Sequence, residues 1–304
     1  MKTCFYTDTG KDFFFSHSGK PIHLMEIGSL SLESLLEEYF GAESYEWRRG
    51  DEYCDLLVSL HELPEKCVLK EFFQQVSGTD APKILKSTQN HEILAWWRCN
   101  PSGAMDMEIV WTDAFPIRLS YYWDLINLHE KLASSFSTCF DRDAVSPLST
   151  VSGVLEMGEG SVILPGVVIE GFVRIGSNCK IGPNCFIRGC TSIGNNCIIG
   201  QSVEIKNSLI GSGTMVPHLS YVGDSVIGSN VNIGAGGICS NFRHDAGLHR
   251  VMLDGKLVET GRQKLGALIG DDAKIGCHTI IYPGRMIAAG KTSLPGEIIS
   301  ANKE

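Results

Sequence analysis

Residues 157–205 decide the fold, and they read MGEGSVILPGVVIEGFVRIGSNCKIGPNCFIRGCTSIGNNCIIGQSVEI. An aliphatic residue occurs at every sixth position of this stretch: Met157, Ile163, Ile169, Ile175, Ile181, Ile187, Ile193, Ile199 and Ile205. A period of six is neither helical nor that of an ordinary strand. It is typical of a chain that coils as a three-sided prism with about 18 residues per turn. The strands of successive turns then pair about 4.8 Å apart.

The residues between the aliphatic positions agree with a narrow coil. Small side chains recur four residues after them, and four cysteines fall on interior positions: Cys179, Cys185, Cys197 and Cys239. Asparagine stands at three corners, where the backbone needs a positive φ that asparagine tolerates: Asn178, Asn184 and Asn196. The pattern resembles that of hexapeptide-repeat proteins, which implies a left-handed parallel β-helix.

The repeat is interrupted once at length. It slips by one residue at Ile210 and again between Val222 and Ile227, and then breaks for an excursion over residues 241–268. The coil restarts at Ile269. Long loops on rigid scaffolds often carry function, so we expect the excursion to contribute to a site.

The first half of the chain lacks the six-residue period. Residues 1–117 predict a small α/β domain, with helices at 31–40 and 64–76 and a buried strand at Ile93–Trp97. Residues 118–150 predict a linker helix, at about 119–136, and a connection to the β-helix over 151–304. The predicted fold class is therefore mainly β, a left-handed parallel β-helix preceded by a small α/β domain. The first half holds no G-x-G-x-x-G and no Walker loop.

Composition excludes several classes of function. The chain has 26 Lys and Arg against 35 Asp and Glu, a net charge of −9, and no basic run, so nucleic acid is not an expected partner. No segment approaches the roughly 20 apolar residues of a membrane span. The eleven cysteines show no zinc-finger spacing, so no metal site is predicted. Interior thiols and the absence of a signal peptide predict a cytoplasmic protein.

Three elements carry a more specific resemblance. They are residues 216–224 (VPHLSYVGD), residues 230–236 (NVNIGAG) and Asn241. They resemble the acetyltransferase half of the bifunctional glucosamine-1-phosphate acetyltransferase and N-acetylglucosamine-1-phosphate uridylyltransferase family. Residues 261–271 (GRQKLGALIGD) are more similar to the archaeal-type sugar-1-phosphate nucleotidylyltransferase/acetyltransferase branch. The resemblance covers residues 118–299. It implies an acetyl-CoA-dependent N-acetyltransferase acting on glucosamine 1-phosphate, in a homotrimer whose sites lie between neighbouring chains, with cell-wall precursor synthesis as the implied pathway.

The resemblance also implies a role for individual residues. His218 matches the general base, and imidazole suits proton transfer near neutral pH. Asn241 matches a substrate-contacting asparagine, and the backbone N–H of Ala235 matches the donor that stabilises the oxyanion. The substrate-binding positions, of which the two basic ones hold a phosphate, are Arg188, Lys206, Tyr221 and Asn232. Cys277 and Ala289 match positions that line the groove for acetyl-CoA.

The chain departs from the family at two places. Residues 1–50 contain no glycine-rich loop of the uridylyltransferase type, so the first half is interpreted as a shortened relic without uridylyl transfer. In the excursion, Gly247 stands where the family has a lysine, with Arg250 as a possible substitute.

Other functions stay open from the sequence. The same prism carries zinc hydratases of the γ-carbonic anhydrase type, although the available histidines have no recognisable ligand spacing: His218, His244, His249 and His278. A third reading is a non-catalytic protein that binds sugar nucleotides. Within the acetyltransferase reading, galactosamine 1-phosphate stays open as the acceptor.

Overall fold

The structure is a computed structural model that describes residues 121–133, 137–253 and 255–303, together with short segments before residue 121. The chain divides into two compact units, residues 1–14 with 33–124, and residues 15–32 with 125–304. Among the described helices, none combines the length and the apolar composition that crossing a membrane requires.

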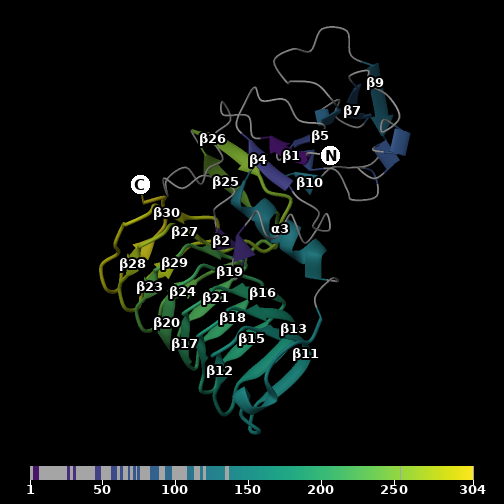
Figure 1. Cartoon of the computed structure of the whole chain (residues 1–304). Helices are drawn as coiled ribbons and strands as arrows, with labels where there is room; N and C mark the ends of the chain where they lie inside the picture. Colours follow the sequence, from purple (N-terminus) through teal and green to yellow (C-terminus); the bar gives the residue numbers. More distant parts are fainter. Residues whose placement is uncertain are drawn as a thin grey trace. The chain divides into compact units, whose positions relative to one another are not determined.

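The first unit contains a mixed six-stranded sheet (Figure 1). Its order is β4-β1-β5-β8-β7-β9, with β8 antiparallel to both neighbours and the other pairs parallel. The strands are β1 (Thr3–Tyr6), β4 (Tyr45–Arg48), β5 (Leu56–Ser59), β7 (Lys83–Ser87), β8 (Ile93–Trp97) and β9 (Glu108–Thr112). A second, two-stranded sheet pairs β6 (Glu62–Leu63) with β10 (Ile117–Arg118).

The predicted elements of the first half are partly covered by the described residues. The strand at Ile93–Trp97 is confirmed as β8, and residues 68, 71–72 and 74–75 are helical within the predicted helix 64–76. Of the predicted helix 31–40, Ser31 instead ends strand β3 (Leu30–Ser31), which pairs with β2 (Glu26–Ile27) in the second unit. The rest of that helix lies outside the described residues.

The second unit is a parallel β-helix, which confirms the fold that the six-residue period predicts (Figure 1). Its first face comprises β12 (Val162–Ile163), β14 (Lys180–Ile181), β17 (Ile198–Gln201), β20 (Met215–His218), β23 (Asn232–Ile233) and β28 (Lys274–Ile275). The second comprises β15 (Phe186–Arg188), β18 (Glu204–Lys206), β21 (Tyr221–Gly223), β24 (Ile238–Cys239), β29 (Ile280–Ile281) and β31 (Ile298–Ile299). The third comprises β16 (Cys190–Ile193), β19 (Leu209–Ile210), β22 (Val226–Ile227), β27 (Leu268–Ile269) and β30 (Met286–Ile287). Two longer strands, β11 (Thr150–Met157) and β13 (Val168–Ile175), run across the second and third faces.

The repeat residues form the core of this coil. The aliphatic positions from Ile163 to Ile205 are at most 2% exposed, and the four predicted interior cysteines are buried with them. The corner residues Asn178, Asn184 and Asn196 have φ of 57°, 53° and 57°, as their positions predict. The slips in the period appear as shorter turns, because Ile193 pairs with Ile210 and Ile210 with Ile227.

The predicted linker helix is α3 (Tyr122–Leu132), which is followed by a short 3-10 helix, η5 (Arg142–Ala144). The excursion contains a hairpin of β25 (Arg250–Leu253) and β26 (Lys256–Glu259). Leu265 N donates to Asn241 O at 3.0 Å, which joins the two ends of the excursion, and Gly266 N donates to Asp224 O of the preceding turn at 2.8 Å.

A buried histidine lies where α3 packs on the coil. His129 is 1% exposed, and its Nδ1 lies 3.0 Å from Cys190 Sγ on β16. Burial lowers the pKa of His129 from 6.5 to about 4, and the nearby charge of Arg174 adds to the effect. Burial also raises the pKa of Cys190 to about 12, so both groups are neutral at pH 7.

His129 is therefore expected to make the protein acid-sensitive. Between pH 6.5 and about 4 the unfolded chain protonates this imidazole and the folded chain does not, so the free energy of unfolding falls as the pH falls. The loss attributable to His129 is about 3 kcal/mol over this range. Urea unfolding of the wild type and His129→Gln at pH 7 and pH 4.5 measures it. We expect the free energy of unfolding to fall less between these two pH values in His129→Gln than in the wild type. An equal fall in both proteins would contradict the assignment to His129.

Candidate functional site

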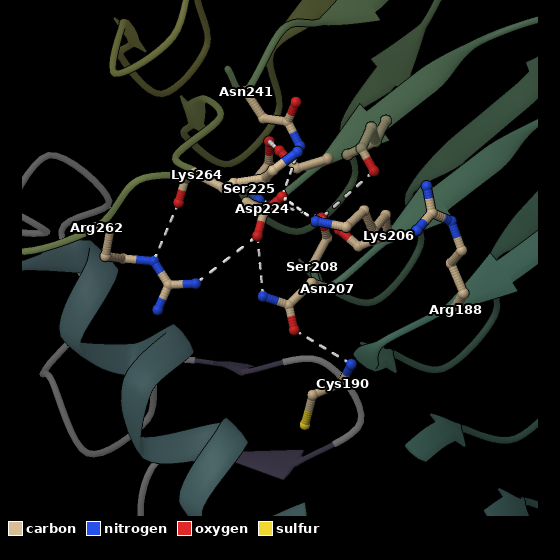
Figure 2. A network of polar contacts seen from close by, with 12 residues as sticks. Arg188, Cys190, Lys206, Asn207, Ser208, Asp224, Ser225, Asn241, Arg262 and Lys264 are labelled. Atoms are coloured by element: carbon tan, nitrogen blue, oxygen red, sulfur yellow. Dashed lines mark hydrogen bonds and ion pairs between the residues drawn. The ribbon is translucent and has the colours of Figure 1, made fainter. Parts of the chain in front are cut away.

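Asp224 is the centre of a buried polar network at the corner that follows β21 (Figure 2). Its side chain is only 3% exposed. Oδ2 accepts from Lys206 Nζ at 2.8 Å and from Asn241 Nδ2 at 2.6 Å, and Oδ1 accepts from Asn207 Nδ2 at 3.0 Å. The guanidinium of Arg262 lies 3.7 Å from Oδ1. Two cations and two amides thus compensate the cost of burying this carboxylate.

The register of the coil explains why these residues meet. Lys206 ends β18 and pairs with Gly223 of β21, so Asn207 and Asp224 occupy equivalent corner positions on successive turns. Both have positive φ, 50° and 47°. Tyr221 and Val222 pair with Ile238 and Cys239, which brings Asn241 to the same corner one turn later.

Asn241 joins this network to Tyr221. Its Nδ2 also donates to the Tyr221 hydroxyl at 3.0 Å, and Asn241 as a whole is 7% exposed. Burial, with the nearby charges of Asp224 and Glu204, raises the pKa of Tyr221, so the phenol stays protonated. The glycine between them leaves room for this contact: a Cβ at Gly223 would lie 2.5 Å from the Tyr221 hydroxyl and 2.6 Å from Asn241 Nδ2.

Arg188 lies one turn before Lys206 on the second face, since the two residues pair in register. Its guanidinium forms an ion pair with Glu204 at 2.7 Å and lies 5.2 Å from the centre of the Phe186 ring. The Arg188 side chain is 35% exposed, compared with 19% for Lys206. Arg188 is therefore the more accessible of the two predicted phosphate-binding cations.

A second group of predicted residues, His218, Ala235 and Cys277, lies at the end of the first face, and we call it the column. Met215 pairs with Asn232, and Ile233 with Ile275, so His218, Ala235 and Cys277 fall at equivalent positions on three successive turns. The carbonyl of His218 accepts from Gly236 N at 3.3 Å, and that of Ala235 accepts from His278 N at 2.8 Å. His218 and Cys277 are exposed. The His218 imidazole and the Ala235 N–H have no hydrogen-bond partner in the described part of the chain.

Two predicted residues lie apart from both groups. Asn232 stands three residues before Ala235, at the start of β23, where it pairs with Met215 and Lys274. Ala289 follows β30 on the third face and packs against Gly270, where a Cβ would lie 2.4 Å from Ala289 N. Within one chain, Ala289 is therefore not on the same face as Cys277, the other predicted acetyl-CoA residue.

Sequence reasoning missed several members of the network. Asp224 and Arg262 stand inside the motifs that carry the resemblance, but neither was assigned a role. Asn207 is a corner asparagine like those of the repeat, and that position was its only signal. Glu130 has no signal in the repeat, because it lies on α3.

Arg262 attaches the excursion to α3. It donates to Glu130 Oε1 at 2.8 Å and also to the side chain of Asn127, while Asn207 donates to Glu130 Oε1 at 2.7 Å. Burial acts to raise the pKa of Glu130, but the hydrogen bonds from Arg262 and Asn207 outweigh it and leave this pKa below its usual value. Glu130 is therefore an ionised partner for Arg262.

The histidines considered for a zinc site do not gather within the chain. Across the described residues, no three His, Cys, Asp or Glu side chains lie where they could hold one metal ion. His249 is 3% exposed and its Nε2 lies 3.2 Å from the carbonyl oxygen of Asn241, so it supports the backbone of the excursion.

The coil is similar in sequence to proteins of known name. Residues 169–243 match the family described as the GMPPB C-terminal domain. A bifunctional sugar-1-phosphate nucleotidylyltransferase/acetyltransferase from Sulfurisphaera tokodaii is 46% identical over 99 residues, which are 33% of this chain and 25% of that protein. The bifunctional protein GlmU of Methanococcus aeolicus is 36% identical over 167 residues, 55% of this chain and 40% of that protein.

These matches confirm the resemblance for the C-terminal region of the chain. The chain matches less than half the length of either relative. Among solved structures, the polySia specific acetyltransferase NeuO covers 53% of this chain and 80% of its own, at 15% identity and a TM-score of 0.29.

Proposed function

We propose that the β-helix is an N-acetyltransferase that uses acetyl-CoA to acetylate an amino-sugar 1-phosphate, with glucosamine 1-phosphate as the first candidate. The observation that carries the proposal is that Lys206 and Asn241 bind one buried carboxylate, Asp224, and that Asn241 also donates to the Tyr221 hydroxyl. All three are positions that the family resemblance assigns to the site. The similarity to a protein named as a bifunctional sugar-1-phosphate nucleotidylyltransferase/acetyltransferase supports the same proposal.

The proposed reaction uses groups of the column. His218 takes a proton from the amino group of the sugar, whose nitrogen attacks the thioester carbonyl of acetyl-CoA. The Ala235 N–H stabilises the oxyanion of the tetrahedral intermediate. When that intermediate collapses, the C–S bond breaks, and the proton held by His218 passes to the departing CoA thiolate. The products are the acetamido sugar phosphate and CoA.

Arg188 and Lys206 bind the phosphate in this proposal, and Tyr221 and Asn232 contact the sugar. Cys277 and Ala289, which lie on different faces of one chain, would line a single acetyl-CoA groove only if neighbouring chains contribute to it. The proposal therefore includes a homotrimer with sites between chains, in the cytoplasm.

The direct test is turnover by the full-length protein. Purified protein is incubated with acetyl-CoA and glucosamine 1-phosphate, and in parallel with galactosamine 1-phosphate, and the acetylated sugar is followed by mass spectrometry. We expect N-acetylated product with at least one of the two. Calorimetric binding of both sugar phosphates without any product would instead favour a non-catalytic binding protein.

Lys206→Met is expected to weaken the Michaelis complex. Loss of a charge-assisted hydrogen bond to the phosphate raises KM for the sugar 1-phosphate by about 10–100-fold, with a smaller change in kcat. KM for unphosphorylated glucosamine should rise less, because this acceptor shares only the disturbance of the Asp224 network and not the lost phosphate contact. Lys256→Met, at the exposed start of β26, is the matched control. Equal losses with both acceptors would show that Lys206 does not bind the phosphate.

A further inference from the structure

The hydrogen bonds of Asn241 determine which way its amide faces. An asparagine amide has two N–H donors and one oxygen acceptor. Here Nδ2 donates once to Asp224 and once to Tyr221, so both N–H groups are used within the network. The amide oxygen points away from Asp224 (Figure 2) and accepts from no residue that the structure describes.

Asp224 allows only this orientation. An ionised carboxylate accepts hydrogen bonds and cannot donate one, so the atom of Asn241 that faces it must be the nitrogen. Lys206 donates to the same carboxylate oxygen, Asn207 donates to the other, and Arg262 lies 3.7 Å from it, so the carboxylate accepts on both sides. An amide at position 224 would tolerate either orientation of Asn241.

The same hydrogen bonds determine whether the Tyr221 hydroxyl donates or accepts. Its oxygen accepts from Asn241, so its own proton is free to be donated to another group. The buried carboxylate thus determines two outward groups, an acceptor on Asn241 and a donor on Tyr221. An amino sugar carries both complements, N–H and O–H donors for the amide oxygen and hydroxyl oxygens for the phenol.

We propose that Asp224 is the positioning residue of the site, which orients Asn241 and Tyr221 to bind the amino sugar while making no contact with it. This inference rests on the proposed acetyl transfer. It assigns the recognition of the amino sugar to the outward Asn241 oxygen and Tyr221 proton, and the recognition of phosphate to Arg188 and Lys206.

The kinetic test is an exchange of the two side chains. Asp224→Asn is expected to raise KM for the amino-sugar phosphate by about 10–100-fold with a smaller effect on kcat. The double variant Asp224→Asn/Asn241→Asp restores one carboxylate facing one amide, with an oxygen again directed outward, but makes the Tyr221 hydroxyl a donor to position 241, so it should recover part of the lost KM. Asn241→Asp alone opposes two carboxylates and should be the worst of the three. A double variant no better than the product of the single effects would overturn the inference.

A second readout does not depend on turnover, and its first measurement needs only the wild type and Asn241→Asp. In wild-type protein labelled with ¹⁵N-asparagine, the side-chain N–H₂ of Asn241 should exchange slowly with solvent, because both protons are bonded in a buried site. Its signal is identified by its loss in Asn241→Asp. Fast exchange in the wild type would overturn the inference. Slow exchange that Asp224→Asn accelerates would support it even if the wild type transferred no acetyl group, a result that would reject the proposed function alone.

Discussion

His218→Ala is expected to reduce kcat for acetyl transfer by about 10²–10⁴-fold, the usual contribution of a general base. The sugar must lose a proton as the new C–N bond forms, and His218 carries the one imidazole among the predicted site residues of the column. The effect on stability should be small, since the side chain is exposed and the His218 carbonyl keeps its hydrogen bonds from Gly236 N and the Ser220 hydroxyl. Steady-state kinetics and thermal unfolding measure the two effects separately.

His244→Ala is the matched control for His218→Ala, because His244 is also exposed but lies in the excursion. It should retain wild-type kcat. The most informative contrary result involves His278, whose Nδ1 would lie 2.5 Å from a Cβ on Gly236. If His278→Ala lost activity and His218→Ala retained it, His278 rather than His218 would be the general base.

Ile199→Ala should lower the free energy of unfolding by about 2–5 kcal/mol, the range for truncating a fully buried aliphatic side chain. Ile199 is 0% exposed and lies inside the coil between turns that cannot collapse into the cavity, because their backbones are held in register. Urea unfolding followed by circular dichroism gives the difference.

The neighbouring residue is the control for this prediction. Ile198 belongs to the same strand, β17, but faces outward and is 36% exposed. Ile198→Ala removes the same atoms as Ile199→Ala. It should lower the free energy of unfolding by much less, because the atoms removed are exposed. Equal losses from the two variants would mean that the interior of the coil is not where its stability arises.

The coil itself could be predicted from the sequence because every turn repeats the same local requirement. Ile187 and Ile205 must fill a narrow interior, and Asn184 must adopt a positive φ. The residue type therefore predicts the position of each residue within the turn. Even the shortened turns follow from the spacing, because a step of five instead of six brings Ile210 beside Ile193.

The candidate site could be predicted only in part. Lys206 and Asn241 follow from the family resemblance, yet their common partner Asp224 emerges only when the corner positions of successive turns are superposed. Arg262 reaches that corner from the far end of the excursion, and no period relates it to Asp224. Contacts made by Glu130 depend on how α3 packs against the coil, which local pattern does not determine.

Val226 of β22, before the excursion, pairs with Leu268 of β27, at its end. The sheet of the third face is therefore continuous across the excursion. Hydrogen bonds at Asn241 and Asp224 close the segment at its base. Extending or shortening such a closed segment adds little entropic cost, which grows only with the logarithm of its length. The length of the excursion can therefore change at little entropic cost, provided that Asn241, Arg262 and Leu265, which attach it to the coil and to α3, are kept.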